Sequence, residues 1–154
     1  MNTNAQDLGN IFGEPIAVYS RRQAIEDGVL VDVSEVITPC PFKYSVAMKR
    51  AAWAATIEAG GTWRADGDGE SLTLPGGQDV KGRTWDVFNV MLATMRGGLK
   101  NAAQRRNTDS SRIYFDVLVD VHGNGRHSKV ELYSVCGPGD NAEPVITIML
   151  QGED

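Results

Sequence analysis

Hydrophobic and polar side chains alternate along the last third of the chain. Residues 113–122 place an apolar side chain at every second position, and residues 130–136 continue the alternation. Turn residues at 123–125 and 137–141 separate these runs from each other and from a third run at 145–150. The third run is apolar on both faces, so we expect it to be the central or most covered strand. The pattern predicts an antiparallel β-meander at the C-terminus.

Two longer stretches upstream have helical patterns. Residues 45–59 are rich in alanine, the strongest helix former, and end at a Gly-Gly pair. Residues 83–103 carry an amphipathic stripe, in which the Gly-Gly pair at 97–98 predicts a kink or an early end. The stripe consists of Trp85, Phe88, Leu92, Met95 and Leu99. We expect both stretches to be the main helices of the fold.

Three shorter elements complete the pattern. Ser20 and Gln23 are spaced as a capping box, which predicts a short helix that ends at Gly28. The β-branched residues at 29–33 predict a strand after it. Residues 62–64 and 71–74 predict two strands joined by an acidic, glycine-rich turn at 65–70.

These elements together predict an α+β fold with two layers, in which the C-terminal meander packs against the two main helices. Residues 1–10 are polar and aperiodic, which predicts a flexible tail. A length of 154 residues fits one domain, so we assign residues 11–154 to a single α+β domain.

Composition and charge narrow the class of protein. The 15 Lys and Arg residues against 20 Asp and Glu residues give a net charge of −5, which argues against a generally basic nucleic-acid binder but leaves a local basic patch open. The chain has no apolar run long enough for a membrane span, so we expect no membrane partner. The N-terminus lacks a signal-peptide pattern, and two cysteines fit a reducing compartment, so we expect a cytoplasmic protein.

No catalytic motif of real specificity is present, and we assign no catalytic residue, no metal ligand and no cofactor. The two histidines are too few for a structural zinc site, which needs four ligands. The alternating carboxylates at 66–70 begin like an EF-hand loop, but the twelfth position is Gly77 where calcium needs a glutamate. A small enzyme or small-ligand binder stays open as an alternative, with a pocket near Asp120, His122 and Glu131.

Two segments carry a resemblance to a known family. Residues 11–33, with the run Tyr19 to Val33, and residues 136–150, with Cys136-Gly137-Pro138-Gly139-Asp140, cover about a quarter of the chain at its two ends. Together they resemble a family of short proteins of uncharacterised function encoded by phages, plasmids and integrating elements. The resemblance implies a setting, that of a small accessory protein on mobile DNA, and it implies no activity or ligand.

We therefore expect a non-enzymatic protein that binds and inhibits a host macromolecule by occlusion, with an anti-CRISPR-like inhibitor as the sharpest version. Its partner would be a host protein or a protein–nucleic-acid complex. Acidic loops would meet a basic groove on that partner, because complementary charge speeds association and gives specificity. The candidate partner-binding residues are Asp66, Asp68, Glu70, Asp140 and Glu143.

A DNA-binding accessory protein is a further alternative. Arg105, Arg106 and Arg112 surround a polar connector and could contact phosphates. No aromatic residues interleave with them to stack on bases, so we favour a solvated connector and do not expect direct nucleic-acid binding. An exposed edge strand of the meander could also pair two copies of the chain as a homodimer.

Overall fold

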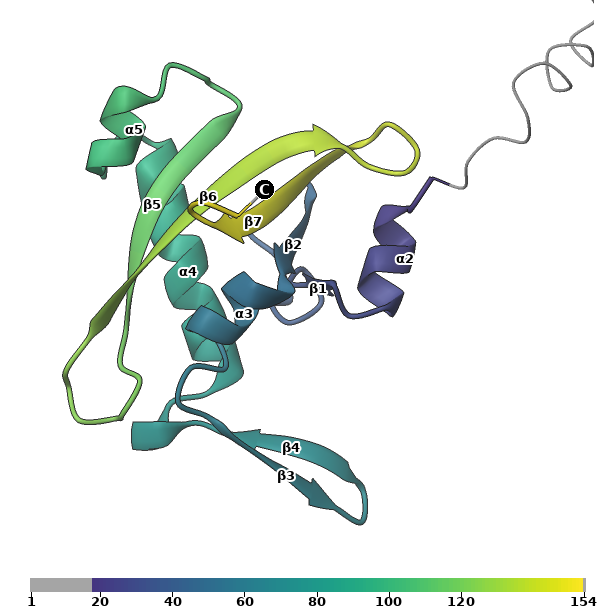
Figure 1. The fold of residues 1–154 in the computed structure, drawn as a ribbon, viewed down its shortest axis with the longest axis vertical. Coiled ribbons are helices and arrows are strands. Elements are labelled where there is room, and N and C mark those ends of the chain that lie inside the picture. Colours follow the sequence, from purple (N-terminus) through teal and green to yellow (C-terminus); the bar gives the residue numbers. More distant parts are fainter. Residues whose placement is uncertain (1–17, 154) are drawn as a thin grey trace, which may run out of the picture.

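The computed structural model describes residues 18–153, and the predicted tail at 1–10 lies outside this range. These residues form a five-stranded mixed sheet with helices packed against it, and a separate two-stranded hairpin (Figure 1). None of the described helices has the length and apolar character needed to cross a membrane. The elements are α2 (Arg21–Glu26), β1 (Leu30–Asp32), β2 (Ser45–Lys49), α3 (Arg50–Thr56), β3 (Thr62–Asp66), β4 (Gly69–Thr73), η1 (Pro75–Gly77), α4 (Val80–Met95), α5 (Ala102–Arg106), β5 (Arg112–Val119), β6 (Ser128–Pro138) and β7 (Pro144–Leu150).

The α+β fold and the C-terminal meander are confirmed. Strands β5, β6 and β7 pair antiparallel in sequence order, and the sheet order is β1-β2-β7-β6-β5. Strand β7 is therefore central, as its apolar pattern predicts. The inner face of the sheet shares one core with α3 and α4, in which Phe88 of α4 and Phe115 of β5 are the largest fully buried side chains.

The prediction of a helix over 45–59 is wrong in its first third. Residues 45–49 form β2, which pairs parallel with β7, and the helix α3 covers only Arg50–Thr56. Val46, Ala47 and Met48 are all fully buried, so this segment lies inside the sheet and not on one side of it. Pairing with a strand about a hundred residues away overrides the local helix propensity of the alanines.

The second helix ends early, at Met95, and its buried side differs from the predicted stripe. Thr84 and Thr94 are buried on α4, whereas Met95 is 47% exposed. Each threonine hydroxyl donates to the carbonyl oxygen one turn earlier, so a residue that counts as polar in the pattern packs as an apolar one. Leu99 lies beyond the helix and is 51% exposed.

The shorter elements agree with their patterns. The Ser20–Gln23 capping box forms at the start of α2, and β1 follows it.

Strand β5 is the sheet edge in the meander, and that edge is partly covered. Its Tyr114 amide donates to Gln104 of α5, and the Asp120 carbonyl beyond it accepts from Arg83. Pairing of two copies through this edge stays a prediction.

Candidate functional site

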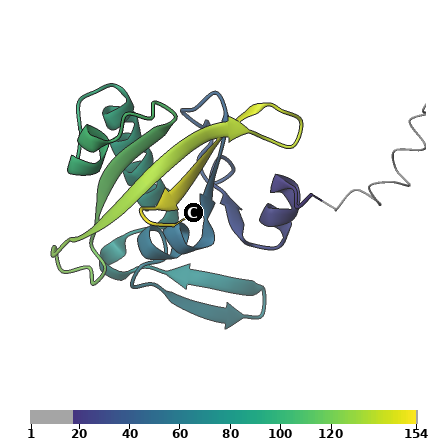
Figure 2. The same ribbon diagram turned by 45° about the horizontal axis from the view of Figure 1, so that its top comes forward.

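The β3–β4 hairpin projects from the body of the molecule, and we refer to residues 62–73 as the arm (Figure 2). Every residue of β3 is exposed, and on β4 only Leu72 is half-buried. The predicted strands and their turn are thus confirmed as a hairpin. Because two strands alone are marginally stable in water, an arm without a packed face has to be held from its base.

The two faces of the arm differ in character. Residues paired across a hairpin share a face, so the register puts Trp63 beside Leu72 and Ala65 beside Glu70 on one face. The opposite face carries Arg64 and Ser71. Trp63 is 51% exposed, and tryptophan is the residue type most enriched among the side chains that dominate binding energy. The arm therefore presents a narrow apolar face.

The tip of the arm is acidic. Asp66, Asp68 and Glu70 lie on or beside the turn, and with Arg64 they give the arm a net charge of −2. Within residues 18–153, no cation lies within ion-pair distance of these three carboxylates. The structure therefore leaves their charge open to a partner.

Close backbone contacts fix the direction of the arm at its base. Gly60 has φ +72°, and a Cβ at this position would overlap the carbonyl oxygen of Val121. On the other side of the arm, a Cβ on Gly76 would lie 2.7 Å from the Cα of Gly123. Only glycine allows these approaches, so both ends of the arm rest against the β5–β6 loop.

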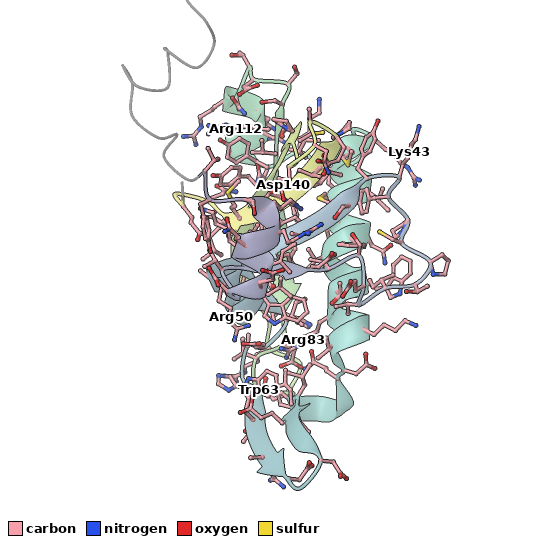
Figure 3. All side chains as sticks on the ribbon, turned by 90° about the vertical axis from the view of Figure 1, so that its right-hand side faces the viewer. Lys43, Arg50, Trp63, Arg83, Arg112 and Asp140 are labelled. Carbon is pink, nitrogen blue, oxygen red and sulfur yellow. The ribbon has the colours of Figure 1, made fainter. Side chains whose placement is uncertain are left out.

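A buried arginine joins the two ends of the arm to the body (Figure 3). Arg83 of α4 is only 5% exposed, and its guanidinium donates to the carbonyl oxygens of Ile57 (3.1 Å), Ala59 and Asp120 (3.0 Å). Its Nε donates to the side chain of Gln78 at 3.0 Å. Burial lowers the pKa of Arg83, and the carboxylates of Asp120 and Asp86 oppose this shift. Sequence reasoning missed this residue, because a lone arginine at a helix start usually lies in solvent.

The structure separates the five predicted acidic residues into two groups. Asp140 and Glu143 lie on the β6–β7 turn beside α2, away from the arm (Figures 1 and 2). The Asp140 carboxylate accepts hydrogen bonds from the backbone amides of Arg21 (2.7 Å) and Arg22 (2.9 Å) at the start of α2. Glu143 accepts from the Asn141 amide at 2.8 Å. These two carboxylates therefore have structural partners, and the three on the arm remain the stronger candidates.

The bonds to Asp140 predict an acid-dependent loss of stability. The amides of Arg22 and Arg21 lower its pKa below the ordinary value of 3.8, so the carboxylate stabilises the fold above that pH and the contribution is lost as the pH falls through the folded-state pKa. We expect Asp140→Asn to lower the melting temperature at about pH 7, and the difference from wild type to shrink at about pH 3. Thermal unfolding followed by circular dichroism measures both.

Asp68→Asn is the matched control, because no hydrogen bond to the Asp68 carboxylate forms among the described residues. A gap between Asp140→Asn and wild type that stays constant over this pH range would contradict the role assigned to Asp140.

The pocket predicted near Asp120, His122 and Glu131 does not assemble as one site. A cavity of about 70 Å³ is lined by Asp120 and His127, but not by His122 or Glu131. The amide of Gly125 donates to the Asp120 carboxylate, which lowers its pKa. Within residues 18–153, no group of three His, Cys, Asp or Glu side chains could hold a metal ion.

The three arginines considered as an alternative nucleic-acid contact lie at the end of the molecule opposite the arm. Arg105 and Arg106 are exposed in the last turn of α5, and Arg112 begins β5. Figure 3 places Arg112 and Trp63 towards opposite ends of the long axis.

Comparison with known proteins adds a family but no activity. The model of a family of unknown function, DUF6573, matches residues 9–154. No curated protein and no solved structure matches the chain. The family match covers nearly the whole sequence, including both segments that carry the resemblance described above. The phage or plasmid setting implied by that resemblance stays a prediction.

Proposed function

The chain belongs to the DUF6573 family of unknown function, and from its own surface we propose that it is a binding protein that uses the arm to occlude a basic surface on a partner macromolecule. The observation that carries this proposal is the contrast within the arm. Its base is fixed by Arg83 and two close glycine contacts, whereas every residue of its two strands except the half-buried Leu72 is exposed.

A rigid, exposed arm favours binding for a physical reason. Association costs conformational entropy whenever a loop has to become ordered, and a hairpin held at its base is ordered beforehand. A half-exposed tryptophan on such an element is costly in water and supplies a large apolar area once it is buried in a partner.

The chemistry of the arm defines the partner. Trp63 and Leu72 require an apolar pocket, and the carboxylates at the tip require cations around it. A groove that binds nucleic acid on a host protein combines these features, because it has cations for phosphates and aromatic surfaces for bases. We propose that the arm competes for such a groove, and that the protein acts as an anti-defence inhibitor, of which an anti-CRISPR-like protein is one form, encoded on a mobile element.

Reversal of the arm charge tests the proposal. The triple variant Asp66→Lys, Asp68→Lys, Glu70→Lys should lose the partner while it keeps the fold, because all three residues are exposed. We expect Trp63→Ala to weaken binding by 2 kcal/mol or more, roughly 30-fold. The measurement is capture of partners by the tagged protein from nuclease-treated host lysate, with quantitative mass spectrometry, followed by titration of the purified partner.

A second triple variant, Glu26→Lys, Glu35→Lys, Glu131→Lys, makes the same change in net charge at exposed positions away from the arm. The proposal requires this control to keep a partner that the arm variants lose. Equal retention by both triple variants, or equal loss, would show that the arm does not carry recognition.

A further inference from the structure

One segment of this acidic chain is strongly basic, since it holds a third of the 15 Lys and Arg residues. Residues 96–112 contain five Lys and Arg residues and a single carboxylate, which gives a net charge of +4. Because the whole chain carries −5, the remaining residues carry −9. The segment runs from the end of α4 through α5 to the start of β5, at the opposite end of the molecule from the arm (Figure 1).

This segment forms a basic groove. A hollow of about 220 Å³ is lined by Lys100, Gln104, Ser110 and Arg112, together with the end of α4, and no carboxylate lines it. Lys100 also lines a neighbouring hollow of about 260 Å³ along the edge of β5. That hollow includes the Asp116 carboxylate, which accepts a hydrogen bond from the side-chain amide of Asn101 at 3.0 Å. The polar groups that line the first hollow include two cations and two further hydrogen-bond donors, which suits an anion with several oxygens.

Aromatic contacts hold one of these cations in place. The guanidinium of Arg112 lies 5.7 Å from the ring centroid of Tyr133, and that ring stacks on Tyr114 at 5.5 Å. A side-chain hydrogen bond to Tyr114 raises the pKa of Arg112. Its ion pair with Asp109, at 3.7 Å, is solvent-exposed and therefore weak. Arg112 is thus oriented by rings and remains open to a stronger anionic partner.

Exposed apolar side chains border the same cations. Met95 lines the basic hollow and Leu99 lines the neighbouring one, and about half of each side chain is exposed. A double helix hides the faces of its bases, whereas a single strand exposes them for contact with apolar and aromatic side chains. Cations and apolar surface in two adjoining hollows, which share Lys100, therefore favour a single strand over a duplex.

We propose that the groove between α4, α5 and β5 binds single-stranded nucleic acid. Lys100 and Arg112 in the groove contact the phosphates, and Met95 and Leu99 lie against the bases. Arg105 and Arg106 line neither hollow, but they are exposed on α5 beside Gln104 and contact phosphates where the strand leaves the groove. This differs from the expectation drawn from the sequence, in which the arginines lacked aromatic neighbours. The fold places Tyr114 and Tyr133 against Arg112, where they orient that cation, and it adds Lys100 to the arginines. Neither ring lines the two hollows, so the surface offered to the bases is that of Met95 and Leu99. The site is independent of the arm, and together the two ends of the molecule fit a protein–nucleic-acid complex.

Fluorescence anisotropy with a labelled oligothymidylate of about 15 nucleotides tests the site on the full chain. Four phosphate contacts predict a slope of log K against log salt of about −2.8, so affinity should fall about 50-fold between about 50 and 200 mM salt. A duplex of the same length should bind at least tenfold more weakly, since its bases are covered.

Arg105→Glu with Arg106→Glu should reduce single-strand affinity at least tenfold. Lys43→Glu with Lys81→Glu makes the same charge change at exposed positions elsewhere and serves as the control for net charge. This control should reduce single-strand affinity less than twofold. Leu99→Ser leaves the net charge unchanged. It should lower the affinity for the single strand and leave the weaker affinity for the duplex unchanged. Circular dichroism confirms that each variant is folded.

Absence of binding at the lower salt concentration would overturn the site, and so would equal losses in the two charge variants. Equal affinity for duplex would overturn the assignment to single strands. Equal affinity for a poly-glutamate peptide of matched charge would overturn nucleic acid as the ligand. The arm variants should bind the oligonucleotide at least as well as wild type, so failure of either proposal is separable from failure of the other.

Discussion

Replacement of Arg83 by methionine is expected to lower the free energy of unfolding by about 3 kcal/mol. The guanidinium is buried and donates hydrogen bonds to acceptors on four segments. The acceptors are Ile57 at the end of α3, Ala59 in the turn that enters the arm, Gln78 after the arm, and Asp120 at the end of β5. Methionine fills much of the same space but donates no hydrogen bond, so it leaves buried carbonyl groups without their donor. Each such group costs about 1–3 kcal/mol, and release of a buried charge offsets part of the sum.

Urea unfolding followed by tryptophan fluorescence measures this change. Arg64→Met on the exposed arm is the control, with an expected effect within about 0.5 kcal/mol. Arg83→Lys keeps the charge but not the planar array of donors, so we expect it to recover little of the loss. An Arg83→Met protein as stable as the control would mean that the acceptors find other donors and that the arm is not held by this residue.

Local patterns predicted those parts of the fold that are determined by neighbours in sequence. The alternation of residues 113–121 and the turns after it define β5, β6 and β7, because the period of two and the turn residues act over a few positions. The capping box at Ser20 and the hairpin around 65–70 are likewise local. In each case the side chains that decide the conformation lie within about ten residues of one another.

The errors come from contacts between distant segments. The alanine-rich stretch at 45–59 contains a strand only because β7 lies beside it, and no nearby residue signals that pairing. The stripe of α4 turned towards Thr84 and Thr94 because their hydroxyls bond within the helix. The exposure of Met95 goes with that different buried side, and Leu99 is exposed because the helix ends before it; neither could be foreseen from a period of 3.6 alone.

The candidate site was predicted in part. Asp66, Asp68 and Glu70 stood out as an acidic turn, but the sequence did not show that the turn ends a projecting arm. Asp140 carried equal weight in the sequence, and the structure gives it a partner in α2, since its carboxylate accepts from the amide of Arg21, 119 residues earlier in the chain. The base of the arm joins Arg83 to segments from residue 57 to residue 120, so its assembly depends on the whole fold.

Gly60→Ala is expected to lower the free energy of unfolding by about 2–5 kcal/mol and to redirect the arm. Two effects add at this position. A positive φ costs an L-residue about 1–2 kcal/mol, and the new Cβ would overlap the carbonyl oxygen of Val121. Because that oxygen belongs to the backbone, relief requires the entrance of the arm to shift, at a further cost of about 1–3 kcal/mol.

Gly28→Ala separates these two effects. Gly28 ends α2 with φ +74°, and a Cβ built there meets no atom within 4 Å, so this variant carries the cost of the positive φ alone. The excess destabilisation of Gly60→Ala over Gly28→Ala therefore measures the contact with Val121. If the arm binds a partner in the orientation that this contact sets, Gly60→Ala must also lose affinity under conditions where it is folded, while Gly28→Ala retains it. Equal stability and equal affinity of the two variants would mean that the backbone at the base of the arm can shift to accept a Cβ at Gly60. Recognition would then have to depend on Trp63 and the acidic tip without a fixed direction of the arm.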